Sequence, residues 1–186
     1  MSGRPPSVEV TSDWRGREDE IAELFRRTFT ASEGAEEGAA VGRLARDLLA
    51  TTPEADLRVF LTEEGGVLAG CILFTRLVYP KDGRSVFLLS PVAVAPEMQG
   101  RGLGQRLIAH GLRALREEGA EVAVTYGDPA FYAKVGFAPV SVAQVAPPQP
   151  LGQPEGWLAQ ALHGEALGPL EGPSRCAPAL DDPAYW

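Results

Sequence analysis

The sequence is poor in the residues that form disulfide frameworks and metal sites. It contains two cysteines, Cys71 and Cys176, among 186 residues, which are too few for a disulfide framework. Its two histidines, His110 and His163, are far apart in the sequence and follow no metal-ligand spacing. We therefore expect no structural disulfides and no metal ion.

Basic residues are also few. Lysine and arginine together number 17 against 25 aspartates and glutamates, which gives a formal net charge of −8. Because nucleic-acid binding needs a basic surface that neutralises phosphates, we expect no nucleic-acid partner. An acidic surface attracts cationic amines, although acidity also serves solubility alone.

Long apolar runs are missing as well. The longest, at residues 67–74 and 86–95, are too short to cross a bilayer and predict buried strands. Residues 1–10, MSGRPPSVEV, lack the apolar core of a secretory signal. We therefore expect a cytoplasmic protein that does not insert into membranes. Its length and ordinary composition predict one globular domain.

The remaining pattern alternates between strand and helix periodicities. We expect strands at residues 8–11, 57–62, 66–79, 85–95, 120–126, 138–146 and 157–163, after a Gly/Pro/Ser tail at 1–7. Expected helices cover residues 17–30, the stretch between a turn at 32–38 and Pro53, the stretch after the turn at 99–104 up to 118, and 128–135. This order predicts an α+β fold with a mixed sheet.

The region after residue 146 differs in composition from the rest. Residues 147–156 contain four prolines and two glycines, which predicts a linker or an extended segment. We therefore divide the chain into a core, 1–146, and a Pro/Gly-rich extension, 147–186, that packs on the same domain. Its aromatic end, 183–186, favours docking over disorder.

A turn rich in glycine follows the apolar run that ends near residue 95. Gln99, Gly102 and Gly104 form the pattern Gln-x-x-Gly-x-Gly, and a helical periodicity begins at Leu103. Such a turn brings backbone N–H groups and a helix N-terminus to an anion, most often a phosphate. The spacing fits neither a Walker A loop nor a dinucleotide-binding fingerprint, because Gln105 stands where the third glycine of that fingerprint belongs.

The pattern resembles the acetyl-CoA loop of the GNAT acetyltransferase superfamily, in its small bacterial form. A second segment, YAKVGF at 132–137, is similar to the family's Tyr-x-x-x-Gly-Phe helix and turn. The two motifs stand in the family's order, and the resemblance covers residues 8–146. It implies a mixed, mostly antiparallel central sheet flanked by helices, with a V-shaped cleft where a bulged central strand splays from its neighbour.

The resemblance also implies where acetyl-CoA binds. Pro91 cannot donate to a strand ladder, so it predicts a bulge or an unpaired side, unless it marks an accidental kink. Beyond it, the backbone from Val92 through Ala93 to Val94 would pair with the pantetheine chain, and the N–H near Val92 would polarise the thioester. The pyrophosphate would lie against Gln99, Gly100, Arg101, Gly102, Leu103, Gly104 and Gln105, with Arg101 or Arg106 adding charge.

Tyr132 is the candidate general acid for the CoA thiolate in this resemblance. A phenol with a pKa of about 10 is protonated at neutral pH and can supply a proton. The alternative is a tyrosine that packs beside Phe131 in the core. The general base stays open among Glu33, Glu36, Glu37, Asp128 and water, and Asp128 is also expected to cap a helix.

These features predict an N-acetyltransferase that moves an acetyl group from acetyl-CoA to a primary amine by direct attack. A route through an acyl-enzyme would need a nucleophile, for which Cys71 and Ser90 are the arguable residues. The alternative is a CoA-binding regulatory or interaction module without acceptor chemistry. The acceptor, a small-molecule or protein amine, is not identified. Monomer and homodimer both stay open, as does the role of 147–186.

Overall fold

The computed structural model describes residues 8–164 and 166–186, so the predicted tail at 1–7 lies outside the described residues. Within the described ranges, one sheet has the strand order β1-β2-β3-β4-β5-β7-β6. Its strands are β1 (Val10–Thr11), β2 (Leu57–Glu64), β3 (Val67–Arg76), β4 (Val86–Val94), β5 (Val122–Tyr126), β6 (Ala138–Pro139) and β7 (Trp157–Ala161). All neighbours pair antiparallel except β4 and β5, which are parallel. The predicted α+β class with a mixed, mostly antiparallel sheet is confirmed.

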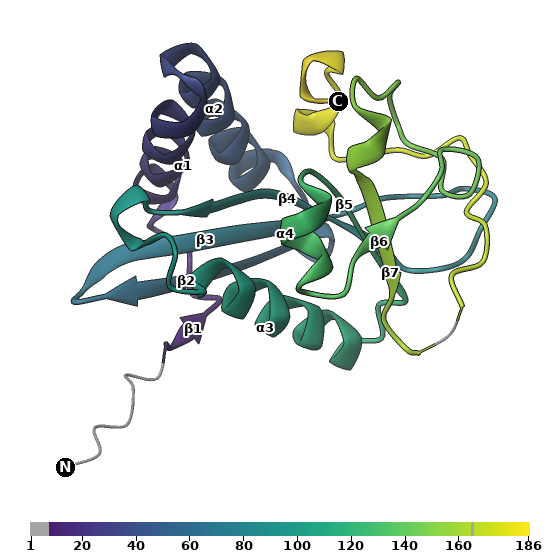
Figure 1. Ribbon diagram of the computed structural model, residues 1–186, viewed down its shortest axis with the longest axis horizontal. Coiled ribbons are helices and arrows are strands. Elements are labelled where there is room, and N and C mark those ends of the chain that lie inside the picture. The colour runs from purple at the N-terminus through teal and green to yellow at the C-terminus, as the bar shows by residue number, and fades with distance from the viewer. Residues whose placement is uncertain (1–7, 165) are drawn as a thin grey trace.

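Helices cover both faces of this sheet (Figure 1). The α-helices are α1 (Glu18–Glu33), α2 (Ala35–Thr51), α3 (Leu103–Glu117) and α4 (Pro129–Ala133). Short 3-10 turns are η1 (Glu54–Asp56), η2 (Pro96–Met98), η3 (Pro154–Gly156), η4 (Pro178–Leu180) and η5 (Pro183–Tyr185). Helices α1 and α2 lie on one face, together with η4, which packs against α2, and α3 lies on the other. No described helix is long and apolar enough to cross a membrane.

The two faces of the sheet have separate hydrophobic cores. On the α1–α2 face, the core includes Phe25 of α1, Leu48 of α2 and Trp157 of β7, and all three are fully buried. On the α3 face, Leu107 and Leu115 pack with side chains of β2, β3 and β4. Each fully buried side chain of this size stabilises the fold by roughly 1.5–3 kcal/mol. The sheet is therefore held rigidly between two cores, which fixes the positions of residues on its central strands.

Strand β4 leaves β5 halfway along its length. Its pairing with β5 covers Val86 to Leu89, whereas its pairing with β3 continues to Val94. The register with β3 shifts, because Ile72 faces Val92 while Phe74 faces Leu89, which leaves an extra residue in β4. The bulge predicted at Pro91 and the open side of the central strand are both present.

The prediction of a strand at 138–146 is wrong beyond Pro139. A turn begins at Ser141, whose hydroxyl accepts a hydrogen bond from the Gln144 N–H at 3.0 Å and whose carbonyl accepts one from the Val145 N–H at 2.9 Å. The alternating valines of this segment therefore do not extend a strand. The strand expected at 157–163 is present as β7, and it lies between β5 and β6. A strand from beyond residue 146 is thus inside the sheet.

The turn expected at 32–38 is also wrong, because Gly34 alone separates α1 from α2. The glycine that suggested a turn, Gly38, is helical and buried. A Cβ there would lie 2.6 Å from the Arg26 carbonyl oxygen, so glycine is needed for the close contact between the two helices. Consequently Glu33 ends α1, and Glu36 and Glu37 lie in the first turn of α2.

Candidate active site

A cleft of about 850 Å³ lies where β4 and β5 separate. Its lining comes from α1, α2, β4, the loop before α3, α4 and residues 178–186. We call it the main cleft. It contains nine of the residues predicted to act or to bind: Val92, Val94, Gln99, Gly100, Gly102, Leu103, Gly104, Gln105 and Tyr132. Two other predicted residues, Ala93 and Arg101, are not part of its lining.

The backbone of β4 explains why Ala93 differs from its neighbours. The Ala95 N–H donates to the Ala69 carbonyl of β3 at 2.8 Å. Because the directions of backbone N–H and C=O groups alternate along a strand, those of Ala93, two residues earlier, also point toward β3. Ala93 is 1% exposed. Val92 and Val94 face the cleft. The Val94 carbonyl accepts from Gln99 Nε2 at 3.0 Å. Because pairing with β5 ends at Leu89, the backbone of Val92 has no partner strand on the cleft side among the described residues.

The glycine loop leads directly into the N-terminus of α3. Gly102 caps this helix with φ 76° and ψ 13°, a left-handed conformation that favours glycine. The first helical bond runs from the Arg106 N–H to the Gly102 carbonyl, at 3.1 Å. The N–H groups of Leu103, Gly104 and Gln105 therefore have no acceptor within the helix, and these residues line the cleft. The first turn of α3 has no acidic side chain, so it suits a phosphate.

Neither arginine predicted to add charge beside the loop reaches the main cleft. Arg101 pairs with Glu64 of β2 at 3.2 Å, and the Arg106 side chain is on the exposed face of α3. The cationic side chain that does line the cleft belongs to Lys134, directly after α4. Lys134 lies inside the Tyr-x-x-x-Gly-Phe motif, so its place next to Tyr132 could have been read from the sequence.

Tyr132 is positioned by the short helix α4. This helix begins with an N-cap, in which Asp128 accepts a hydrogen bond from the Ala130 N–H at 2.9 Å. The Tyr132 ring packs edge-on against Phe131 and Phe137, with centroids 5.0 and 5.8 Å away. Burial raises the pKa of Tyr132, a hydrogen bond with Thr125 lowers it in part, and the charge of Asp128 raises it. The phenol is therefore protonated at neutral pH, and Tyr132 both packs in the core and lines the cleft.

The structure places some of the candidate bases and nucleophiles in the main cleft and others outside it. Glu33 and Glu37 line the main cleft, while Glu36 does not. Asp128 lines it too, although its carboxylate already caps α4. Cys71 is fully buried outside the cleft, and burial raises the pKa of its thiol far above the usual value. No cluster of three or more potential metal ligands occurs in residues 8–164 and 166–186.

Several cleft residues were not predicted from the sequence. Phe29 of α1 and Met98 of η2 contribute apolar surface, and Tyr126 ends β5 at the cleft. Leu180 and Tyr185 come from a segment without strand or helix periodicity. The aromatic end at 183–186 was predicted to dock, and Trp186 does pack on Tyr126 and Trp157. Because these contacts join residues far apart in the sequence, no local signal places Leu180 and Tyr185 in the cleft.

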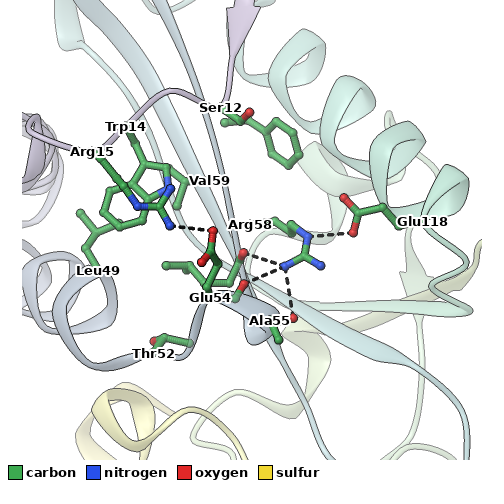
Figure 2. A pocket seen from close by; sticks show the side chains of 12 residues that line it. Ser12, Trp14, Arg15, Leu49, Thr52, Glu54, Ala55, Arg58, Val59 and Glu118 are labelled. Carbon is green, nitrogen blue, oxygen red and sulfur yellow. Dashed lines mark hydrogen bonds and ion pairs between the residues drawn. The ribbon is translucent and has the colours of Figure 1, made fainter.

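A second hollow, of about 580 Å³, lies between Trp14, the end of α2 and the start of β2 (Figure 2). Its charged groups are paired with one another. Arg15 meets Glu54 at 2.8 Å, and Arg58 meets Glu118 at 2.7 Å. Arg58 also donates to backbone carbonyls, including that of Ala55 at 3.2 Å. Because its charges are already satisfied and it contains no part of the glycine loop or α4, this hollow is not the candidate site.

Comparison with known proteins agrees with this geometry. Residues 18–137 match the model of the Acetyltransferase (GNAT) family. The chain is 31% identical over 163 residues to the uncharacterized N-acetyltransferase YjhQ of Escherichia coli K12, covering 85% of this chain and 86% of YjhQ. It is 32% identical over 130 residues to the uncharacterized N-acetyltransferase YhbS of the same strain, covering 70% of this chain and 71% of YhbS.

Solved structures share the fold. The crystal structure of Escherichia coli YhbS in complex with CoA has a TM-score of 0.80 at 22% identity, and the alignment covers 96% of each chain. A GNAT family acetyltransferase from Brucella melitensis in complex with acetyl-CoA has a TM-score of 0.69 at 24% identity, covering 94% of this chain and 98% of the other. The family predicted from two sequence motifs is confirmed: the chain belongs to the acetyltransferase (GNAT) family.

Proposed function

We propose that this protein transfers an acetyl group from acetyl-CoA to a primary amine, by direct attack of the amine on the thioester. The observation that carries the proposal is the main cleft, which brings together the glycine loop, the unpaired side of β4 and Tyr132. Membership of the family supports it, as do the relatives named N-acetyltransferases and the neighbours solved with CoA or acetyl-CoA.

The donor would bind along β4. Its pyrophosphate would accept hydrogen bonds from the N–H groups of Leu103, Gly104 and Gln105 at the start of α3. A pantetheine amide N–H would donate to the Val92 carbonyl, as an added strand would. This arrangement would place the thioester beside the bulge at Pro91. Lys134 would add positive charge to the wall of the cleft.

The attack requires a neutral amine and a stabilised oxyanion. The Val92 N–H would donate to the thioester oxygen, and one such donor contributes on the order of 3 kcal/mol when it is placed at the oxyanion. The proton of the amine would leave through water toward Glu33 or Glu37, or toward Asp128.

Tyr132 would assist the departing sulfur as general acid. An ordinary thiol has a pKa of about 8.5, so a phenol with a pKa above 10 does not protonate a free thiolate to completion. Its main contribution is therefore a hydrogen bond donated while the C–S bond breaks and negative charge develops on sulfur. Burial, by raising the pKa of Tyr132, keeps this donor protonated over the working pH range.

An assay of CoA release tests the proposal. Purified protein, acetyl-CoA and a panel of primary amines are combined, free thiol is measured, and the acetylated amine is identified by mass spectrometry. We expect thiol release that depends on the amine and matches product one to one. A thermal shift with acetyl-CoA but no transfer to any amine would favour the binding module instead. No shift with acetyl-CoA would remove the donor site.

A further inference from the structure

The 178–186 segment forms part of the main cleft, although it lies far along the chain from the family motifs. Leu180, Ala184 and Tyr185 all line the cleft. Across from them, the lining includes apolar side chains of α1 and α2: Phe29, Val41 and Leu44. The segment lies on the face of the sheet that carries α1 and α2, opposite the face covered by α3 (Figure 1).

The segment is held firmly at both ends. Leu180 is 2% exposed, and its carbonyl accepts a hydrogen bond from the Trp186 indole nitrogen at 2.8 Å. Trp186 stacks on Tyr126 with ring planes 14° apart and meets the buried Trp157 edge-on. Between these anchors, the Ala184 N–H donates to the Asp182 carboxylate at 2.9 Å. The wall that Tyr185 belongs to is therefore fixed.

Tyr185 is the residue of this segment whose phenol is in range of charged groups of α2. Its side chain is half-buried and packs against the core on this face. Burial raises the pKa of Tyr185, the charge of Asp182 raises it further, and Arg43 of α2 lowers it, which places the phenol within range of charges on both elements. The ring thus presents an aromatic surface to the cleft.

The surface at this end of the cleft indicates what fits it. The 178–186 segment and the facing helices offer apolar and aromatic side chains, while the polar groups of α1 and α2 in the lining include the carboxylates Glu33 and Glu37. An ammonium group suits the carboxylates, and an apolar body suits the remaining wall. The hydroxyl groups of Thr28 and Ser32 also line this end, but each donates to a backbone carbonyl, so a polyhydroxylated amine would leave most of its hydroxyl groups against apolar carbon.

We propose that the 178–186 segment selects the acceptor, that Tyr185 is its specificity-determining residue, and that the acceptor is a small primary amine on an apolar, aromatic body. This inference rests on the proposed acetyl transfer. According to this inference, residues outside the family motifs determine which acceptor binds, and acetyl-CoA binds at β4 and the start of α3.

The test compares 2-phenylethylamine with ethanolamine as acceptors. For wild type we expect the higher kcat/KM with 2-phenylethylamine. Tyr185→Ala should lower that value roughly 10- to 100-fold, with ethanolamine and the KM for acetyl-CoA changed less than about 3-fold. Tyr185→Phe, which keeps the ring, should behave as wild type. Val67→Ala is the control, because Val67 is 62% exposed and not part of the cleft lining.

A second variant makes the test independent of any loss of stability at Tyr185. Ala184→Phe adds a ring inside the cleft at an exposed position and should exclude 2-phenylethylamine while sparing ethanolamine. If wild type acetylates amines but these variants change both acceptors by the same factor, or wild type prefers ethanolamine, the inference is overturned and the proposed function stands. If wild type binds acetyl-CoA and acetylates nothing, the proposed function fails, and this inference with it.

Discussion

Substitution of Gly102 tests the role of the backbone conformation of the glycine loop separately from the role of the loop's side chains. In Gly102→Ala the new Cβ meets no atom within 4 Å, so the substitution adds no clash. What it adds is strain, because Gly102 has φ 76°. A non-glycine residue in that region costs roughly 1–2 kcal/mol. For a chain of this length, each kcal/mol lowers the Tm by roughly 2–4 °C.

Two further glycines supply matched controls. Gly65, in the hairpin between β2 and β3, has φ 59° and also no atom within 4 Å of a new Cβ. Gly65→Ala should therefore lose similar stability without touching the cleft. Gly83 has the same open space but no positive φ, so Gly83→Ala should keep the wild-type Tm or gain slightly.

The binding measurement is the Tm shift caused by acetyl-CoA at about 100 times the wild-type Kd, which corresponds to about 2.7 kcal/mol of stabilisation. If relief of strain at residue 102 reorients the N–H groups at the start of α3 and weakens binding tenfold, the same concentration gives about 1.4 kcal/mol. Gly65→Ala should retain the full shift. Equal shifts in Gly102→Ala and Gly65→Ala would refute the role assigned to the loop conformation, and a Gly102→Ala Tm equal to that of Gly83→Ala would refute the strain itself.

Three other changes test separate parts of the molecule. Tyr132→Phe should lower kcat by roughly 10² while leaving the Kd for acetyl-CoA nearly unchanged, as measured by thiol release and thermal shift, and unchanged turnover would remove Tyr132 from the mechanism. Cys71→Ala should retain turnover within about 3-fold, because the thiol is buried outside the cleft and a direct transfer does not use it, whereas loss of activity in a folded variant would revive the acyl-enzyme route. The guanidinium of Arg84 lowers the pKa of Asp82 to about 2, so the stability this pair contributes is present above the unfolded pKa of about 4 and is lost as pH falls through about 2. Asp82→Asn should therefore lower the Tm at pH 7 and approach wild type near pH 2, and a constant difference between the two proteins over that range would contradict the assignment.

The bulge in β4, the glycine turn and the start of α3 could be predicted because their signals are local. The spacing of Gln99, Gly102 and Gly104 fixes a turn and a helix start within a few residues, and Pro91 marks the bulge within its own strand. Asp128 was expected as a helix cap, and it accepts the Ala130 N–H. In each case the residue acts on its immediate neighbours in the chain, so the sequence pattern carries the information.

The place of residues 178–186 along the cleft could not be predicted for the opposite reason. Tyr185 lines the cleft in a segment that is held by buried Leu180 and by Trp186 stacked on Tyr126, and these contacts join residues far apart in the chain. Gly38 suggested a turn when judged by its sequence neighbours, whereas its role is a contact between α1 and α2. Such contacts have no local periodicity, so the sequence of each segment does not reveal them.

The position of β7 has a consequence for synthesis on the ribosome. Because β7 lies between β5 and β6, these last two strands of the sheet cannot join β5 until residue 161 has left the exit tunnel. Strands β1 to β5 can pair earlier, since each meets a neighbour that is already translated. The edge of β5 therefore stays unpaired until β7 is available, and an unpaired strand edge is a template for pairing with another chain.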